Sequence, residues 1–120
     1  MEEQPMSVHL GVERDAGCVV TVSGDADLHA AANVERELVS LADSGHASIV
    51  VDLSDATFID STMLRVLLNV SKRLRPEGEL LVVCHEHNIR KIFEITLLDR
   101  VFAIFDSREA ALEHLGVDAW

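Results

Sequence analysis

Residues 48–75 read SIVVDLSDATFIDSTMLRVLLNVSKRLR, and this stretch decides the fold. It begins with an apolar run within Ser48–Leu53, which predicts a strand buried on both faces. Residues 54–60 are predicted to form a loop. Ser61–Arg75 then carries apolar residues at helical spacing, and Pro76 stops the predicted helix. A buried strand that leads into an amphipathic helix is typical of an α/β protein.

The same periodicities predict the other elements. Strands are predicted over Ser7–Glu13 and Cys18–Ser23, and the short turn Asp15-Ala16-Gly17 makes them an antiparallel hairpin. A helix is predicted to follow the N-cap Asp27 and to run to Ser44. Further strands over residues 79–84 and 101–105 alternate with helices over residues 88–98 and 108–115. The predicted fold is therefore α/β, a single mixed β-sheet covered by helices in the order β-β-α-β-α-β-α-β-α.

Length and charge limit the class of protein. The chain has 120 residues, which suits one domain over residues 1–120. Its formal net charge is −11, from 10 basic and 21 acidic residues, which argues against direct binding to nucleic acid or to an anionic membrane. A basic protein partner is the natural inference from this charge.

Other features bear on location and chemistry. The acidic start Met1–Pro5 is unlike a signal peptide, and no apolar run has the length of a membrane span. Cys18 and Cys84 fall in predicted strands, where they are expected to be buried, reduced thiols, so a cytoplasmic protein is expected. His85-Glu86-His87 lacks an evident third metal ligand, and no set of acid, base and nucleophile can be assembled. We therefore expect no metal, no cofactor and no enzymatic activity.

The junction between the buried strand and its helix carries Asp60-Ser61-Thr62. On a helical wheel of about 100° per residue, Ser61 lies opposite Met63 and the other apolar residues, and it lies near Arg65 and Leu68. Ser61 is therefore expected to be exposed. An exposed leucine beside an exposed serine indicates a contact surface.

Two interpretations of Ser61 follow from its position. A phosphate there would bring roughly −1.5 to −2 charges at neutral pH, which the helix N-terminus and Arg65 could accommodate. Such a group would repel or exclude a partner from this face. The alternative is plain helix capping, because Asp60 and Ser61 are both good N-cap residues. Spacing by itself favours capping.

Three segments in this order resemble the STAS domain family, and within it the anti-sigma factor antagonists. In chain order, the segments are Gly24-Asp25-Ala26-Asp27, residues 50–62 and residues 98–112. The second segment ends in Asp60-Ser61-Thr62. In the D-S-[S/T]-G-L-G pattern of that family, Met63 and Arg65 occupy the glycine positions here. Met63 is expected to point inward, whereas Arg65 adds bulk and charge at the contact. Leu97 also stands where the family often has glycine, which we interpret as a local packing change.

The resemblance implies a STAS-like sheet and a partner-switching function. The unphosphorylated chain would bind an anti-sigma factor, which is also a serine kinase, and a metal-dependent serine phosphatase would reverse the phosphorylation. ATP and Mg²⁺ would belong to the kinase, so this chain needs no cofactor, and we expect a monomer or weak dimer. The site residues implied are the phosphoacceptor Ser61 and the partner-binding residues Asp27, Asp60, Thr62, Arg65 and Leu68.

Two other classes of protein remain as alternatives. A STAS-like scaffold without phosphorylation would use Ser61 only as a helix residue. A phosphoaspartate receiver domain has a similar size and class, but Phe105-Asp106-Ser107 lacks the lysine that such a domain needs after its last strand.

Overall fold

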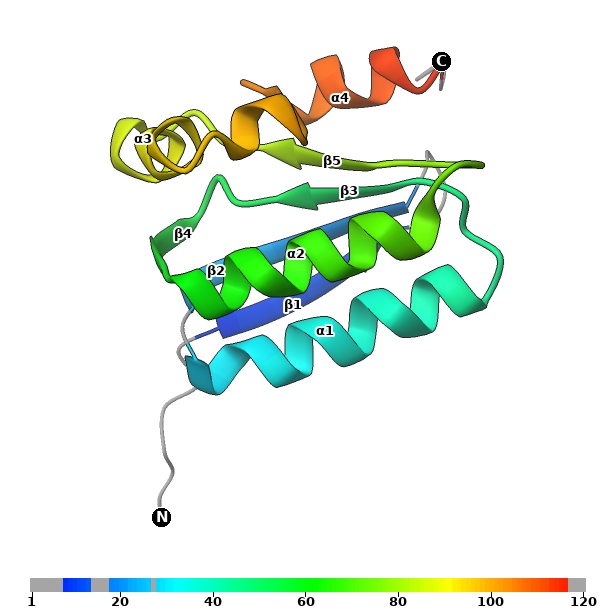
Figure 1. Cartoon of the computed structure of the whole chain (residues 1–120), viewed down its shortest axis with the longest axis horizontal. Coiled ribbons are helices and arrows are strands. Elements are labelled where there is room, and N and C mark those ends of the chain that lie inside the picture. Colours follow the sequence, from blue (N-terminus) through cyan, green and yellow to red (C-terminus); the bar gives the residue numbers. More distant parts are fainter. Residues whose placement is uncertain (1–7, 14–17, 27, 117–120) are drawn as a thin grey trace.

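In the computed structural model, residues 8–13, 18–26 and 28–116 are described, and they form a mixed sheet with helices on both faces (Figure 1). The predicted α/β class and the initial hairpin are confirmed. The elements in chain order are β1 (Val8–Glu13), β2 (Cys18–Ala26), α1 (Leu28–Asp43), β3 (Ile49–Asp52), β4 (Ala56–Ile59), α2 (Ser61–Leu74), β5 (Leu80–Val83), α3 (His87–Ile95), the 3₁₀ helix η1 (Leu98–Arg100), β6 (Ala103–Phe105) and α4 (Arg108–His114).

The sheet has the strand order β1-β2-β3-β5-β6, and β4 pairs separately with β2. Only the β1–β2 pair is antiparallel among the described strand pairs, so the sheet is mixed, as predicted. The predicted turn over residues 15–17 and the predicted N-cap Asp27 lie outside the described residues. The carboxyl ends of β3, β4 and β5 meet the chain that enters α2 and α3, which places the start of α2 at this edge of the sheet.

The predicted loop over residues 54–60 is wrong in part, because Ala56–Ile59 forms β4. The first half of β2 pairs with β3, and its end pairs with β4, with a shift of register between Gly24 and Asp25 within this second pairing. The N–H of Gly24 donates to the carbonyl oxygen of Asp55 at 3.0 Å. A strand of only four residues has too little periodicity to be recognised, and it forms here because the long strand β2 offers it a partner.

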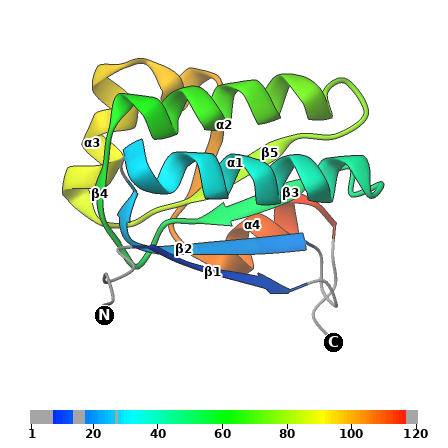
Figure 2. The ribbon, with the colours of Figure 1, turned by 90° about the horizontal axis from the view of Figure 1, so that it is seen from below.

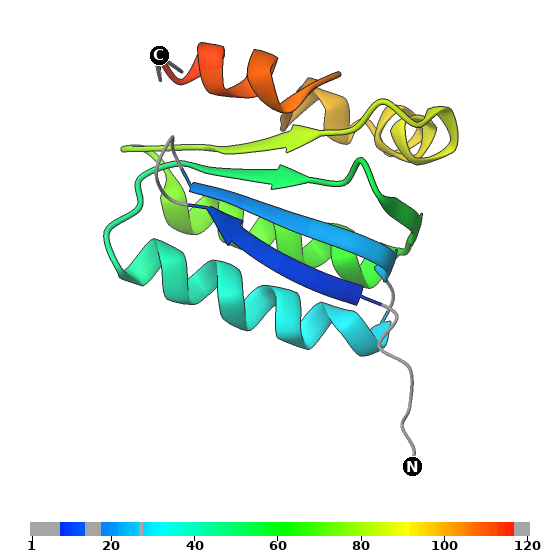
Figure 3. The ribbon, with the colours of Figure 1, turned by 180° about the vertical axis from the view of Figure 1, so that it is seen from behind.

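The sheet buries apolar residues on both faces, as predicted for the strand after Ser48. Helices α1 and α2 cover one face, and α4 lies on the other (Figure 2). Figure 3 shows the molecule from behind, with β1 and β2 nearest the viewer. Helix α4 contacts β3, β5 and β6. The second, smaller core consists of Val19, Val50, Leu81, Val83 and Ala111. Alternation along β3 directs Val50 and Asp52 to this smaller core.

The two thiols are buried, as predicted. Cys18 is 3% exposed and Cys84 is 0% exposed, and no disulfide joins them. Burial raises the pKa of the Cys84 thiol above its usual value, so this sulfur stays protonated at neutral pH.

Leu97 departs from the family pattern through its backbone rather than through packing. It lies between α3 and η1 with φ +63° and ψ +17°, in the left-handed region, and its side chain is 56% exposed. Glycine adopts this conformation without a steric penalty, which explains why glycine suits the position. Leu97 adopts this conformation at the steric cost that a Cβ brings there.

We therefore expect Leu97→Gly to raise the free energy of unfolding by about 0.5–1 kcal/mol. The left-handed conformation costs leucine about 1–2 kcal/mol, which exceeds the added chain entropy of glycine, about 0.5–1 kcal/mol. Urea unfolding measures the difference. Val101→Gly is the matched control, since Val101 has an ordinary φ of −97° and should lose stability. A loss of stability in both variants would contradict the strain at Leu97.

Candidate functional site

Helix α2 is capped by Asp60. Asp60 has extended backbone angles, φ −118° and ψ −179°, and its Oδ1 accepts a hydrogen bond from the N–H of Met63 at 3.1 Å. This is the geometry of an N-cap aspartate, whose charge also suits the positive end of the helix. Ser61 is consequently the first helical residue. Asp60 and Ser61 are both good N-cap residues, but Asp60 provides the cap.

Ser61 is exposed, as predicted. Within the described part of the chain, no group forms a hydrogen bond with its hydroxyl. Met63 is 0% exposed and points into the core, also as predicted, while Arg65 is exposed. The start of α2 thus presents an unengaged hydroxyl with a guanidinium one helical turn away.

Two other predicted partner-binding residues are less exposed. Thr62 is half-buried. Leu68, which the helical wheel placed on the exposed side, is also half-buried and packs against the larger core, so its predicted exposure is wrong. A wheel treats the helix in isolation, whereas neighbouring elements close over the flanks of a packed helix. Of these residues on α2, Ser61 and Arg65 are exposed to solvent, whereas Leu68 is half-buried.

Asp27 lies outside the described residues, so its part in the site stays a prediction. The strand that precedes it does reach the site. Asp25 is opposite Phe58 and Ala26 is opposite Ile59 in the β2–β4 pair. Because Asp60 follows Ile59 directly, the end of β2 lies beside the entry to α2.

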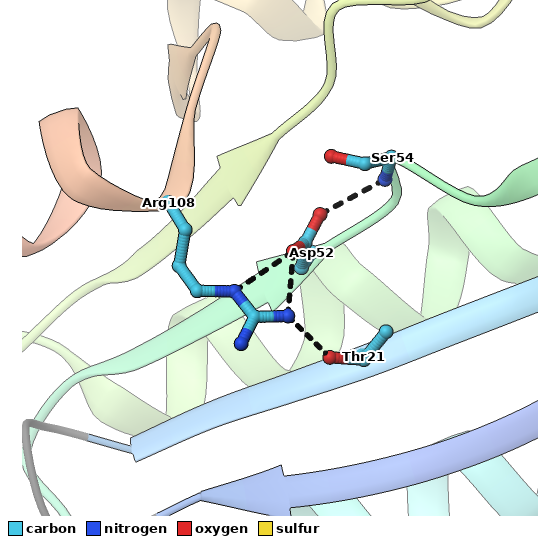
Figure 4. A network of polar contacts seen from close by, with 4 residues as sticks. All are labelled: Thr21, Asp52, Ser54 and Arg108. Carbon is cyan, nitrogen blue, oxygen red and sulfur yellow. Dashed lines mark hydrogen bonds and ion pairs between the residues drawn. The ribbon is translucent and has the colours of Figure 1, made fainter.

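A network of polar contacts that was not predicted from the sequence surrounds the buried Asp52 at the end of β3 (Figure 4). Oδ2 of Asp52 accepts hydrogen bonds from Nε and Nη2 of Arg108 at 3.0 and 2.9 Å. The same Nη2 donates to Oγ1 of Thr21 at 2.8 Å, and Oδ1 of Asp52 accepts from the N–H of Ser54 at 2.9 Å. The network joins β2, β3 and the first residue of α4.

This network supports the bend between β3 and β4. The Asp52–Ser54 bond holds the chain where β3 ends, and the N–H of Ala56 donates to the carbonyl oxygen of Leu53 at 3.0 Å within the same turn. Strand β4 then leads to Asp60. A charged residue at the end of an apolar strand was a visible signal in the sequence. Its partner Arg108 was not, because 56 residues separate the two.

The pKa of Asp52 lies below its usual value of 3.8. Burial acts to raise this pKa, but the hydrogen bonds from Ser54 and the neighbouring Arg108 guanidinium outweigh it. Asp52 is therefore ionised at neutral pH and forms a true ion pair with Arg108, at 2.9 Å.

His85 and His87 flank Glu86, the N-cap residue of α3. Glu86 caps α3, since its Oε1 accepts from the N–H of Ile89 at 3.1 Å, and both histidines are exposed. Among the described residues, no group of three or more His, Cys, Asp or Glu side chains could hold a metal ion. No described helix has the length and apolarity that a membrane crossing requires.

Comparison with known proteins identifies the class that this fold and site define. The STAS domain family model matches residues 7–111, and the chain belongs to this family. It is 35% identical over 98 residues to BtrV of Bordetella bronchiseptica, named an anti-sigma factor antagonist, with 81% of this chain and 84% of BtrV covered.

Solved structures agree with this assignment. The crystal structure of an anti-sigma factor antagonist from Mycobacterium paratuberculosis superimposes with a TM-score of 0.85 at 28% identity, over 94% of this chain and 97% of that one. The phosphorylated form of the Bacillus cell fate determinant SpoIIAA has a TM-score of 0.68 at 18% identity, over 90% and 98% of the two chains, which supports the fold alone. The relatives of this chain are thus anti-sigma factor antagonists.

Proposed function

We propose that this protein is an anti-sigma factor antagonist that works by partner switching and that Ser61 is its phosphorylation switch. In the unmodified state it binds an anti-sigma factor, which then releases its sigma factor. In the phosphorylated state it dissociates from that partner. A serine phosphatase restores the first state.

The observation that carries the proposal is that Asp60, and not Ser61, caps helix α2. Asp60 performs the capping of α2, so the hydroxyl of Ser61 is exposed and is not needed for the fold. A residue that only capped the helix would have its oxygen engaged with backbone N–H groups. The names of the relatives support the choice of partner. A phosphorylated Bacillus protein of the same fold is a precedent for phosphate on such a domain.

The transfer itself requires little of this chain. The Ser61 oxygen attacks the γ-phosphorus of ATP bound to the kinase, the bond from that phosphorus to ADP breaks, and the hydroxyl proton passes to a base of the kinase. This chain supplies an exposed acceptor at a helix start, where the positive end of α2 stabilises the new charge.

The test is phosphorylation by the serine kinase anti-sigma factor from the same genome, with ATP and Mg²⁺, followed by mapping with mass spectrometry. We expect a single phosphate on Ser61 and none on the Ser61→Ala variant. Thr62→Val is the matched control and should be modified at the normal rate. Phosphate on Thr57 or Thr62 instead would contradict Ser61 as the switch. No transfer to the chain would favour the scaffold without phosphorylation.

A further inference from the structure

The exposed side of α2 is basic, although the whole chain has a net charge of −11. The helix sequence STMLRVLLNVSKRL contains three cations and no acid. Arg73 is already engaged, since its guanidinium pairs with the Asp43 carboxylate at 3.1 Å. Arg65 and Lys72 are exposed, and neither has an ion-pair partner among the residues that the structure covers. The exposed side of α2 therefore carries a charge opposite to the net charge of the protein, although the N-cap Asp60 lies beside Ser61 at its start.

Ser61 and the two unpaired cations, Arg65 and Lys72, lie in a row along one side of α2. The spacings of four and seven residues from Ser61 to Arg65 and from Arg65 to Lys72 keep all three on one side of the helix. At a rise of about 1.5 Å per residue, the line extends roughly 16 Å along α2. We call Ser61, Arg65 and Lys72 the α2 stripe.

We propose that the α2 stripe docks an acidic segment of the protein partner, and that Arg65 binds a carboxylate of this segment before phosphorylation and the phosphate of Ser61 afterwards. This inference rests on the proposed function and specifies its partner surface. It replaces the basic partner that net charge suggested, because a partner responds to the charge of the surface that it contacts.

Competition for Arg65 follows from proximity. The phosphate carries about −1.5 to −2 charges and sits one helical turn from the guanidinium, so the pair forms within one chain. The partner carboxylate must reach the same guanidinium from another molecule, and an intramolecular competitor has the higher effective concentration. The phosphate on Ser61 therefore repels the acidic segment of the partner. It also pairs with Arg65, which no longer binds the partner carboxylate.

The first arm of the test needs no kinase. Phosphoserine is incorporated at position 61 of the full chain by an expanded genetic code, and the second pKa of its phosphate is measured by ³¹P NMR titration. We expect a value below the usual one of about 6. We expect Arg65→Gln to raise this pKa by roughly 0.2–0.4 unit, and Lys72→Gln to leave it unchanged. An unchanged pKa in the Arg65 variant would overturn the shared role of Arg65.

The second arm measures binding of the unmodified chain to the anti-sigma factor kinase at two salt concentrations. We expect Arg65→Glu to weaken binding about tenfold or more, and added salt to weaken binding of the parent chain. Arg36→Glu is the matched control, because it makes the same charge change at an exposed arginine of α1 that does not belong to the α2 stripe. Equal losses in the two variants, or tighter binding by Arg65→Glu, would overturn the acidic partner.

The two arms also separate this inference from the proposed function. If the parent chain does not bind the anti-sigma factor or is not phosphorylated by it, the proposed function fails. If Arg65→Gln leaves the pKa of the installed phosphate unchanged, this inference is overturned while Ser61 phosphorylation stands. The same holds if Arg65→Glu weakens binding no more than Arg36→Glu does.

Discussion

Ser61→Asp is expected to weaken binding to the anti-sigma factor about 30-fold or more, whereas Ser61→Ala should bind as the parent chain does. A like-charge contact at an interface costs several kcal/mol, and each 1.4 kcal/mol corresponds to about a tenfold change in affinity. The alanine variant adds no charge and removes a hydroxyl that the fold does not use. Isothermal titration calorimetry with the purified anti-sigma factor gives both affinities.

The loss should not come from unfolding. An acidic residue at the first position of α2 interacts favourably with the helix N-terminus, by about 0.3–1 kcal/mol, so Ser61→Asp should be as stable as the parent chain or slightly more so. Ser40→Asp is the matched control, since it makes the same change at an exposed position of α1. Equal affinity of the aspartate and alanine variants at Ser61 would remove the basis for the switch.

Asp52→Asn is expected to lower the free energy of unfolding by about 2–3 kcal/mol at neutral pH. The Asp52 side chain is 7% exposed and the Arg108 side chain 33%, so the substitution removes a buried carboxylate from its ion pair with a half-buried guanidinium. Thr21→Val removes only a neutral acceptor of the same network and should cost about 1 kcal/mol. Amide hydrogen exchange should also accelerate in β4, because Asp52 holds the bend before it.

The pH dependence of stability provides an independent check on Asp52. Its pKa is lowered in the folded state, so the stability that it contributes is present above the unfolded pKa of about 3.9. That contribution is lost as the pH falls through the lower, folded pKa. The parent chain should therefore lose stability more steeply than Asp52→Asn below about pH 4, and the two should converge. Parallel curves down to the lowest pH would contradict the ion pair.

Local patterns in the sequence determined the order of elements apart from β4, and the exposed and buried positions along α2 apart from Leu68. The apolar run in β3 and the helical spacing after Ser61 each arise from contacts within a few residues, and such rules are visible in a single sequence. For the same reason Ser61 was expected outside and Met63 inside, and both expectations are confirmed. The resemblance to the STAS family likewise rested on the residues of three short segments, each of which is visible in the sequence.

Only the tertiary structure decided how the site is supported. Strand β4 exists because β2 pairs with it, Leu68 is half-buried because it packs against the larger core, and Asp52 pairs with Arg108, which is 56 residues away in the sequence. Each depends on sheet register and helix packing, which local periodicity does not specify. The structure also assigned the cap of α2 to Asp60, a choice that two good capping residues in succession left open. That assignment makes Ser61 available for modification.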